Sequence, residues 1–131
     1  MIKILLCCGG GFSSSYITEK LKKQILANGL EKEVSIEYSP FSLGLKSASN
    51  YDIMVCCPHL NISVKQAIKD NRATIPIYIL PPRMYGLMDI KEIYHDVKDL
   101  LIIHETTRIN PVHFAGEENP LRITRTKAYN R

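Results

Sequence analysis

The sequence predicts an α/β protein in which four parallel strands form a sheet covered by helices on both faces. Two observations favour this fold class. Four short segments are almost continuously apolar, as strands buried on both faces of a sheet are. Between them, apolar residues recur at the period of an amphipathic helix. With 131 residues, 45% of them hydrophobic, the chain is long enough for one compact domain with its own core.

The chain opens with a predicted strand and helix. IKILLCC, at residues 2–8, is typical of a buried strand because it is short, continuously apolar and followed by glycine. A helix is predicted over residues 14–29, because Ile17, Leu21 and Ile25 recur every four residues with lysines between them, and a glycine offers the stop. The loop between this strand and this helix is therefore made almost entirely of glycine and serine.

The middle of the chain repeats the alternation. EVSIEY at residues 33–38 predicts the second strand, and YDIMVCCP at residues 51–58 predicts the third. We expect an irregular crossover at residues 39–50 between them. A helix over residues 61–70 and a buried strand over residues 75–80 complete the four-stranded sheet.

A last helix is predicted from Asp89, because Glu92 follows three residues later in the pattern of a capping box. Beyond residue 102 no sustained period remains, and two prolines interrupt isolated apolar residues. We therefore expect one folded domain over residues 1–101 and a C-terminal extension over residues 102–131, which is an irregular tail of uncertain order and unknown role.

Composition and charge exclude several classes of protein. The longest apolar runs fall far short of the roughly 20 residues of a membrane helix, and no signal peptide opens the chain, so we expect a soluble, cytoplasmic protein. The four cysteines form two adjacent pairs, which favours a reducing compartment over disulfides. The net charge of +4 is scattered among acidic residues, so we expect no nucleic-acid partner.

Cys8 is the candidate nucleophile because it directly precedes the small-residue loop. Successive backbone N–H groups of such a loop can converge on an anion, and the helix that follows adds its positive end. The same donors stabilise a thiolate, which is the nucleophilic form of cysteine. We expect a phosphate on Cys8 to be held by the phosphate-binding loop, whose residues are Gly9, Gly10, Gly11, Phe12, Ser13, Ser14 and Ser15.

Other interpretations of this loop remain open. Cys7 and Cys8 could both be small core residues beside a tight turn, although only Cys7 lies wholly within the strand. A Walker loop is absent because no lysine occurs before Lys20, and the dinucleotide fingerprint lacks its third glycine. Cysteine phosphatases place an arginine six residues after the cysteine, where this chain has Ser14. Carrying a phosphoryl group is therefore favoured over hydrolysing it.

Three motifs together resemble a known family. CGGGFSSS (residues 8–15) is similar to the phosphorylation loop of the IIB component of the bacterial sugar phosphotransferase system (PTS), of the lactose, cellobiose and chitobiose type. YDIMVCCPHL (residues 51–60) resembles that family's third strand and its exit, and MYGLMD (residues 84–89) resembles its Tyr-Gly turn. The resemblance covers about residues 1–101 and implies the same four-stranded parallel sheet.

The resemblance also implies a phosphotransferase. Cys8 would accept a phosphoryl group from a phosphohistidine of the IIA phosphocarrier protein. Phosphocysteine would then pass it to a sugar, such as the β-linked disaccharides cellobiose or lactose, bound by the membrane permease IIC. The protein would be cytoplasmic and peripheral to the membrane through IIC. It would need no cofactor and no metal beyond the transient covalent phosphate on Cys8.

Three other residues are candidates for accessory roles at the site. His59 follows the third strand and could donate a hydrogen bond to the phosphate or relay a proton, although a surface loop histidine is the more common explanation. Arg83 and Tyr85 are predicted to lie in a loop that could close over Cys8, and Arg83 could supply the cation that Ser14 does not. The remaining histidines lie in no motif that predicts a phosphohistidine, and the cysteine spacing is wrong for zinc.

Two departures from the family leave alternatives open. Three consecutive glycines replace its commoner mixture of serine and alanine, and the tail has no counterpart in single-domain members. The tail is a truncated linker, a partner-binding arm or a strap across the domain. The rival functions are a low-molecular-weight cysteine phosphatase and a non-catalytic binding protein on the same fold.

Overall fold

The computed structural model describes residues 1–8, 12–117, 119 and 125–129, with the backbone alone described for residue 8 and residues 12–15. No helix in these ranges is long and apolar enough to cross a membrane. The elements in chain order are β1 (Ile2–Cys8), α1 (Phe12–Ala27), β2 (Val34–Pro40), α2 (Phe41–Ser47), the 3-10 helix η1 (Ala48–Asn50), β3 (Ile53–Cys56), the 3-10 helix η2 (Pro58–Leu60), α3 (Asn61–Lys69), β4 (Ile77–Ile79), α4 (Pro82–Leu87) and α5 (Ile90–Thr107).

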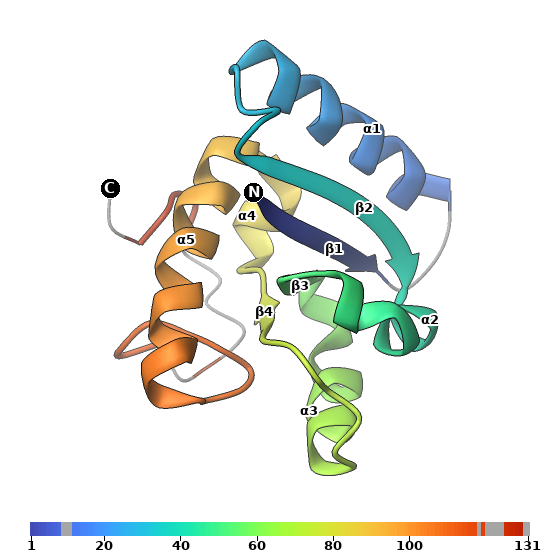
Figure 1. Ribbon diagram of the computed structural model, residues 1–131, viewed down its shortest axis with the longest axis vertical. Helices are drawn as coiled ribbons and strands as arrows, with labels where there is room; N and C mark the ends of the chain where they lie inside the picture. Colours follow the sequence, from blue (N-terminus) through green and yellow to red (C-terminus); the bar gives the residue numbers. More distant parts are fainter. Residues whose placement is uncertain (9–11, 118, 120–124, 130–131) are drawn as a thin grey trace.

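The four strands form one sheet in the order β2-β1-β3-β4, and every neighbouring pair is parallel. In the register, Ile4 of β1 lies beside Ile36 of β2 on one side and Ile53 of β3 on the other. The predicted fold class is therefore confirmed. Figure 1 shows α1 running alongside β1 and β2, and α5 and α3 on opposite sides of β4.

Each face of the sheet has its own apolar core, because alternate strand residues point to opposite faces. One core joins Ile4 and Leu6 of β1 to Leu21 of α1 and Val97 of α5. The other core packs alternate residues of the same strands, Leu5 among them, against α2 and α3. All five of these side chains are at most 1% exposed, so helices on both faces exclude water from the sheet.

Two segments predicted to be irregular are helical, and these predictions were wrong. Residues 39–50, expected as a crossover, contain the end of β2 followed by α2 and η1. The segment around Arg83 and Tyr85, expected as a loop, is α4, with a proline at its first position. Helices of six or seven residues span fewer than two turns, so they leave no repeating apolar period in the sequence.

Several predicted boundaries also shift. β2 extends to Pro40, whereas β3 and β4 are only Ile53–Cys56 and Ile77–Ile79. Helix α1 begins at Phe12, two residues before its predicted start. The core continues past the end of the strand pairing, since Leu80, just beyond β4, is fully buried. An apolar run therefore marks what is buried and overestimates the length of the strand.

The segment after residue 101 is not an arm of uncertain order where the structure describes it. Helix α5 continues to Thr107, and the chain then returns along β4. The N–H of Ile77 donates to Asn110 Oδ1 at 2.9 Å, and the N–H of Val112 donates to the carbonyl of Ile77 at 2.9 Å. Val112 and Phe114 are 1% and 2% exposed and join the core of α1 and α5. The strap is therefore the alternative that matches the described tail.

A buried polar cluster fastens the end of this strap. The carboxylate of Asp96 is fully buried and lies 2.6 Å from the guanidinium of Arg125, and it also accepts from the hydroxyl of Tyr78 and the N–H of Tyr129. Burial by itself lowers the pKa of Arg125, but Tyr78, Asp96 and Glu117 outweigh it and raise that pKa above its usual value. The division into two domains at residue 101 stays a prediction.

Candidate functional site

The candidate site lies at the carboxyl edge of the sheet. β1 ends at Cys8, β3 ends at Cys56 and β4 ends at Ile79, and the next helical element begins within a few residues of each. Because all strands are parallel, these ends meet at one edge. The topology therefore brings Cys8, His59 and the helix that carries Arg83 to the same side of the molecule.

Cys8 is the last residue of β1, and its Cα is paired with that of Pro40 in β2. Gly9, Gly10 and Gly11 lie outside the described residues. The other predicted loop residues, Phe12, Ser13, Ser14 and Ser15, form the first turn of α1. The backbone N–H groups of a first helical turn have no partner within the helix and carry its positive partial charge.

The start of α1 suits an anion electrostatically as well. Its first turn contains no acidic residue, so no carboxylate of the helix competes for the free N–H groups. A strand that ends in a thiol, followed after three residues by a helix N-terminus, is an arrangement that can stabilise both a thiolate and a phosphate. The backbone of residues 9–11 and the side chains of residues 12–15 lie outside the description, so the phosphate-binding loop stays a prediction.

Cys7 lies in packing, as predicted, and is fully buried. The space around the Cys7 side chain is tightly packed, because a Cβ added to Gly44 of α2 would lie 2.8 Å from the Sγ of Cys7. Cys56 and Cys57 are fully buried too, and neither forms a disulfide in the described ranges. Cys57 is bound to β1 twice, since its N–H and its Sγ both donate to the carbonyl of Cys7, at 3.1 and 3.3 Å.

His59 and Tyr85 contact each other across two segments that follow different strands. His59 is exposed in η2 after β3, and Tyr85 is half-buried in α4 after β4. Their ring centroids are 6.0 Å apart with an interplanar angle of 73°, which is an edge-to-face contact. Arg83 is exposed on the same helix as Tyr85. The structure thus brings His59 and Tyr85 together and leaves the Arg83 guanidinium at the surface.

Gln24 positions α4 and was missed from the sequence. Its side-chain amide donates to the carbonyl of Met88 at 3.2 Å, and its Oε1 accepts the N–H of Ile90 at 2.8 Å. Gln24 therefore ties α1 to the turn between α4 and α5, where Met88 adopts a left-handed backbone conformation. A polar residue adjoining the apolar positions Leu21 and Ile25 is the only sequence signal for this role.

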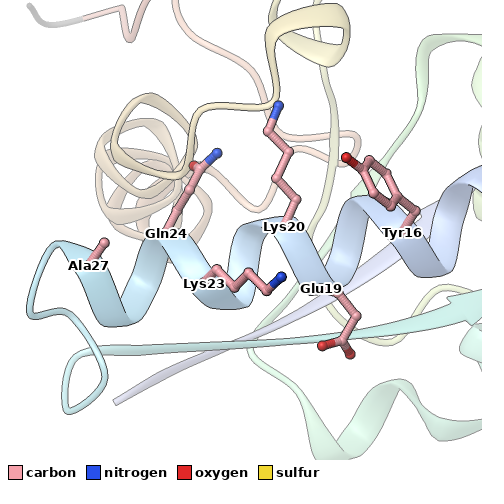
Figure 2. Close-up of a pocket in the computed structure, with 6 residues that line it drawn as sticks. All are labelled: Tyr16, Glu19, Lys20, Lys23, Gln24 and Ala27. Atoms are coloured by element: carbon pink, nitrogen blue, oxygen red, sulfur yellow. The ribbon is translucent and has the colours of Figure 1, made fainter.

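A shallow groove of about 400 Å³ runs along α1. The described residues that line it all come from α1, and Figure 2 shows Lys20 and Gln24 extending from one side of the helix and Glu19 from the other. Tyr16, nearest the candidate site, is 73% exposed. None of the described residues that line the groove is a predicted catalytic residue.

No group of three or more histidine, cysteine, aspartate or glutamate side chains in the described ranges is placed to hold a metal ion.

Residues 3–96 match the family model described as the lactose/cellobiose-specific IIB subunit of the PTS system. The matched region contains Cys8, His59, Arg83 and Tyr85, and it ends within α5, before the strap. Nothing among the curated proteins matches the chain.

Proposed function

The chain belongs to the family of lactose/cellobiose-specific IIB subunits of the PTS system, and from this premise we propose that Cys8 carries the phosphoryl group. Membership supports the general role of a phosphoryl carrier and a phosphotransferase. The observation that carries the assignment to Cys8 is its place as the last residue of β1, with three residues between it and the N-terminus of α1.

The reaction has two transfers at one sulfur atom. The Cys8 thiolate attacks the phosphorus of a phosphohistidine on IIA, the S–P bond forms, and the N–P bond breaks with its electron pair going to the imidazole. A sugar hydroxyl bound by IIC then attacks the same phosphorus, loses its proton, and releases the thiolate. The first-turn N–H groups of α1 stabilise the charge on the phosphoryl oxygens during both transfers.

The accessory roles proposed for His59, Arg83 and Tyr85 rest on their position at the same edge of the sheet. The edge-to-face contact with Tyr85 orients the His59 ring, which donates to a phosphoryl oxygen. Arg83, exposed on α4, supplies positive charge once a partner has covered the site. None of the three replaces the thiol, so their loss slows transfer without removing the site of phosphorylation.

Partner docking is supported by exposed apolar side chains near the starts of the helices that follow the strands. Tyr16 of α1, Leu43 of α2 and Ile62 of α3 are 73%, 56% and 80% exposed. IIA and IIC would use this edge in turn, because each must bring its reacting group to Cys8. Docking excludes water, which otherwise hydrolyses the phosphocysteine. The protein then works on the cytoplasmic side of the membrane, at the IIC permease, with cellobiose or lactose as the sugar.

Intact-protein mass spectrometry tests the proposal. The wild-type protein is incubated with phosphoenolpyruvate, the general PTS proteins and a panel of IIA proteins, beside Cys8→Ser and Cys7→Ser. We expect one phosphoryl adduct in the wild type and in Cys7→Ser, none in Cys8→Ser, and discharge of the adduct when IIC and sugar are added. Cys7→Ser is the matched control, because it changes the neighbouring thiol.

A phosphorylated Cys8→Ser protein would refute the assignment. Steady release of inorganic phosphate from an aryl phosphate, dependent on Cys8, would support the phosphatase alternative. Absence of any adduct with every donor would favour a non-catalytic binding protein on this fold.

A further inference from the structure

Cys57 occupies the strand position next to Cys8. Cys7 of β1 and Cys56 of β3 are paired in register, and Cys8 and Cys57 each follow one residue later. The N–H of Cys57 donates to the carbonyl of Cys7, and its backbone is extended, with φ −66° and ψ 154°. The parallel ladder thus continues one residue past the end of β3, opposite Cys8.

This spacing is compatible with a disulfide. Neighbouring strands lie about 4.8 Å apart, which falls within the range of roughly 4.4–6.8 Å between the Cα atoms of bridged cysteines. Strand residues alternate between faces, so the position of Cys8 belongs with Ile4 and Leu6. Cys57 packs in the same core cluster as these two residues. The two cysteine positions are therefore neighbours on one face of the sheet.

We propose that Cys8 and Cys57 form a reversible disulfide when a peroxide oxidises the protein, and that this bond blocks phosphoryl transfer. The blocking of transfer rests on the function proposed above, whereas formation of the bond does not. Cys8 would act as the reactive thiol and Cys57 as the resolving thiol.

The chemistry balances in two steps. The Cys8 thiolate attacks hydrogen peroxide, the O–O bond breaks, and hydroxide leaves, so that Cys8 becomes a sulfenic acid. The sulfur of Cys57 then attacks the sulfur of Cys8, the S–S bond forms, and the S–O bond breaks. Hydroxide leaves and combines with the proton of the Cys57 thiol. Two thiols and one peroxide thus give one disulfide and two waters, and an added dithiol reverses the bond.

The burial of Cys57 fits the resolving role. Its side chain is fully buried, so dissolved peroxide reaches it poorly, but a sulfenic acid at the adjacent strand position does not need to cross solvent. Its Sγ already lies against β1, 3.3 Å from the carbonyl of Cys7. Cys7 and Cys56 are also in register and equally buried, but neither adjoins the anion-stabilising loop that activates a thiol.

The test compares wild type, Cys57→Ser, Cys57→Ala and the matched control Cys56→Ser. Each reduced protein receives hydrogen peroxide, is denatured in N-ethylmaleimide, and is measured by intact mass and by mapping of linked peptides. We expect the wild type and Cys56→Ser to lose two labelled thiols and gain one Cys8–Cys57 crosslink. Both Cys57 variants should instead gain oxygen atoms on Cys8. Circular dichroism confirms that the variants fold.

Phosphorylation by a IIA donor is the second measurement. Oxidised wild type should accept no phosphoryl group until dithiothreitol is added. The Cys57 variants, whose Cys8 excess peroxide carries on to the sulfinic or sulfonic acid, should not recover. A wild type that gains oxygen atoms on Cys8 without a crosslink, or that links Cys7 to Cys56, would overturn the inference. If the Cys8–Cys57 bond forms but the reduced protein is never phosphorylated, the proposed disulfide is supported and the proposed function is refuted.

Discussion

Replacing Arg125 by methionine should destabilise the protein by breaking the buried ion pair that fastens the strap. The Arg125 guanidinium lies 2.6 Å from the carboxylate of Asp96, whose side chain has no exposed area, and 3.0 Å from the hydroxyl of Tyr78. Methionine retains most of the length and apolar volume of the side chain but none of its charge. The variant therefore leaves a buried carboxylate without its cation.

The expected loss in unfolding free energy is about 3–5 kcal/mol, which is the usual cost of breaking a buried ion pair by removing one partner. Asp96 could regain water only if the strap lifted away. That would expose Val112 and Phe114, which are 1% and 2% exposed and contribute about 1.5–3 kcal/mol each. Either route gives a loss of similar size, so relaxation of the tail does not remove the effect.

Urea unfolding followed by circular dichroism measures this loss, with Lys22→Met as the control. Lys22 pairs with Glu37 at 3.3 Å, but both side chains reach solvent, so loss of this pair should cost about 1 kcal/mol or less. The melting temperature of Arg125→Met should be lower than that of the wild type by roughly 10–20 °C for a chain of this size. The double variant Arg125→Met with Asp96→Asn should recover part of the loss, because the uncompensated charge is gone.

A loss below about 1 kcal/mol for Arg125→Met would refute the reasoning, because it would mean that Asp96 is hydrated in the folded protein. A double variant that is less stable than Arg125→Met alone would contradict the electrostatic explanation and indicate that hydrogen bonding to the carboxylate dominates.

Three further predictions concern packing, capping and pH. Gly44→Ala should lower the unfolding free energy by about 1–3 kcal/mol in urea titrations, because its Cβ would meet the Cys7 Sγ at 2.8 Å, whereas Gly86→Ala, with open space, should not destabilise α4. Asp89→Ala should cost about 1 kcal/mol and Asp89→Asn much less, because the side chain accepts an N–H at the start of α5; equal losses would exclude capping. Burial, and then the charge of Arg108, lower the pKa of His104 in the folded protein. The neutral ring therefore contributes stability that is fully present above the unfolded pKa of about 6.5 and is lost as pH falls through the folded pKa. His104→Gln should therefore gain stability relative to wild type between pH 7.5 and pH 5, and an unchanged difference would contradict this.

The alternation of apolar strands and amphipathic helices was sufficient to predict the fold class, because burial on both faces of a parallel sheet leaves uninterrupted apolar runs. The same pattern placed Cys8 at the end of the first strand and Asp89 at the start of the last helix, where its carboxylate accepts the N–H of Lys91. Local chemistry determines each of these features, so a single segment of sequence carries the signal.

Short helices and contacts between distant residues left no such signal. Helices α2 and α4 were predicted as irregular segments because two turns or fewer cannot display a period. Glu92, predicted to complete a capping box, accepts the N–H of Ala128 at 2.6 Å. A carboxylate at that position satisfies either role, and only packing of the strap against α5 decides which donors reach it.

The sequence alone therefore determined that this chain has a parallel α/β fold with a cysteine before a loop of glycine and serine, because hydrophobic period and local turn chemistry are properties of neighbouring residues. Only the tertiary structure decided that the tail is a strap. Its fastening depends on Asp96 and Arg125, which are 29 residues apart and meet at 2.6 Å only after α5 and the sheet have packed. The placement of Cys57 opposite Cys8 was likewise decided by the register of β1 and β3, because register depends on long-range pairing.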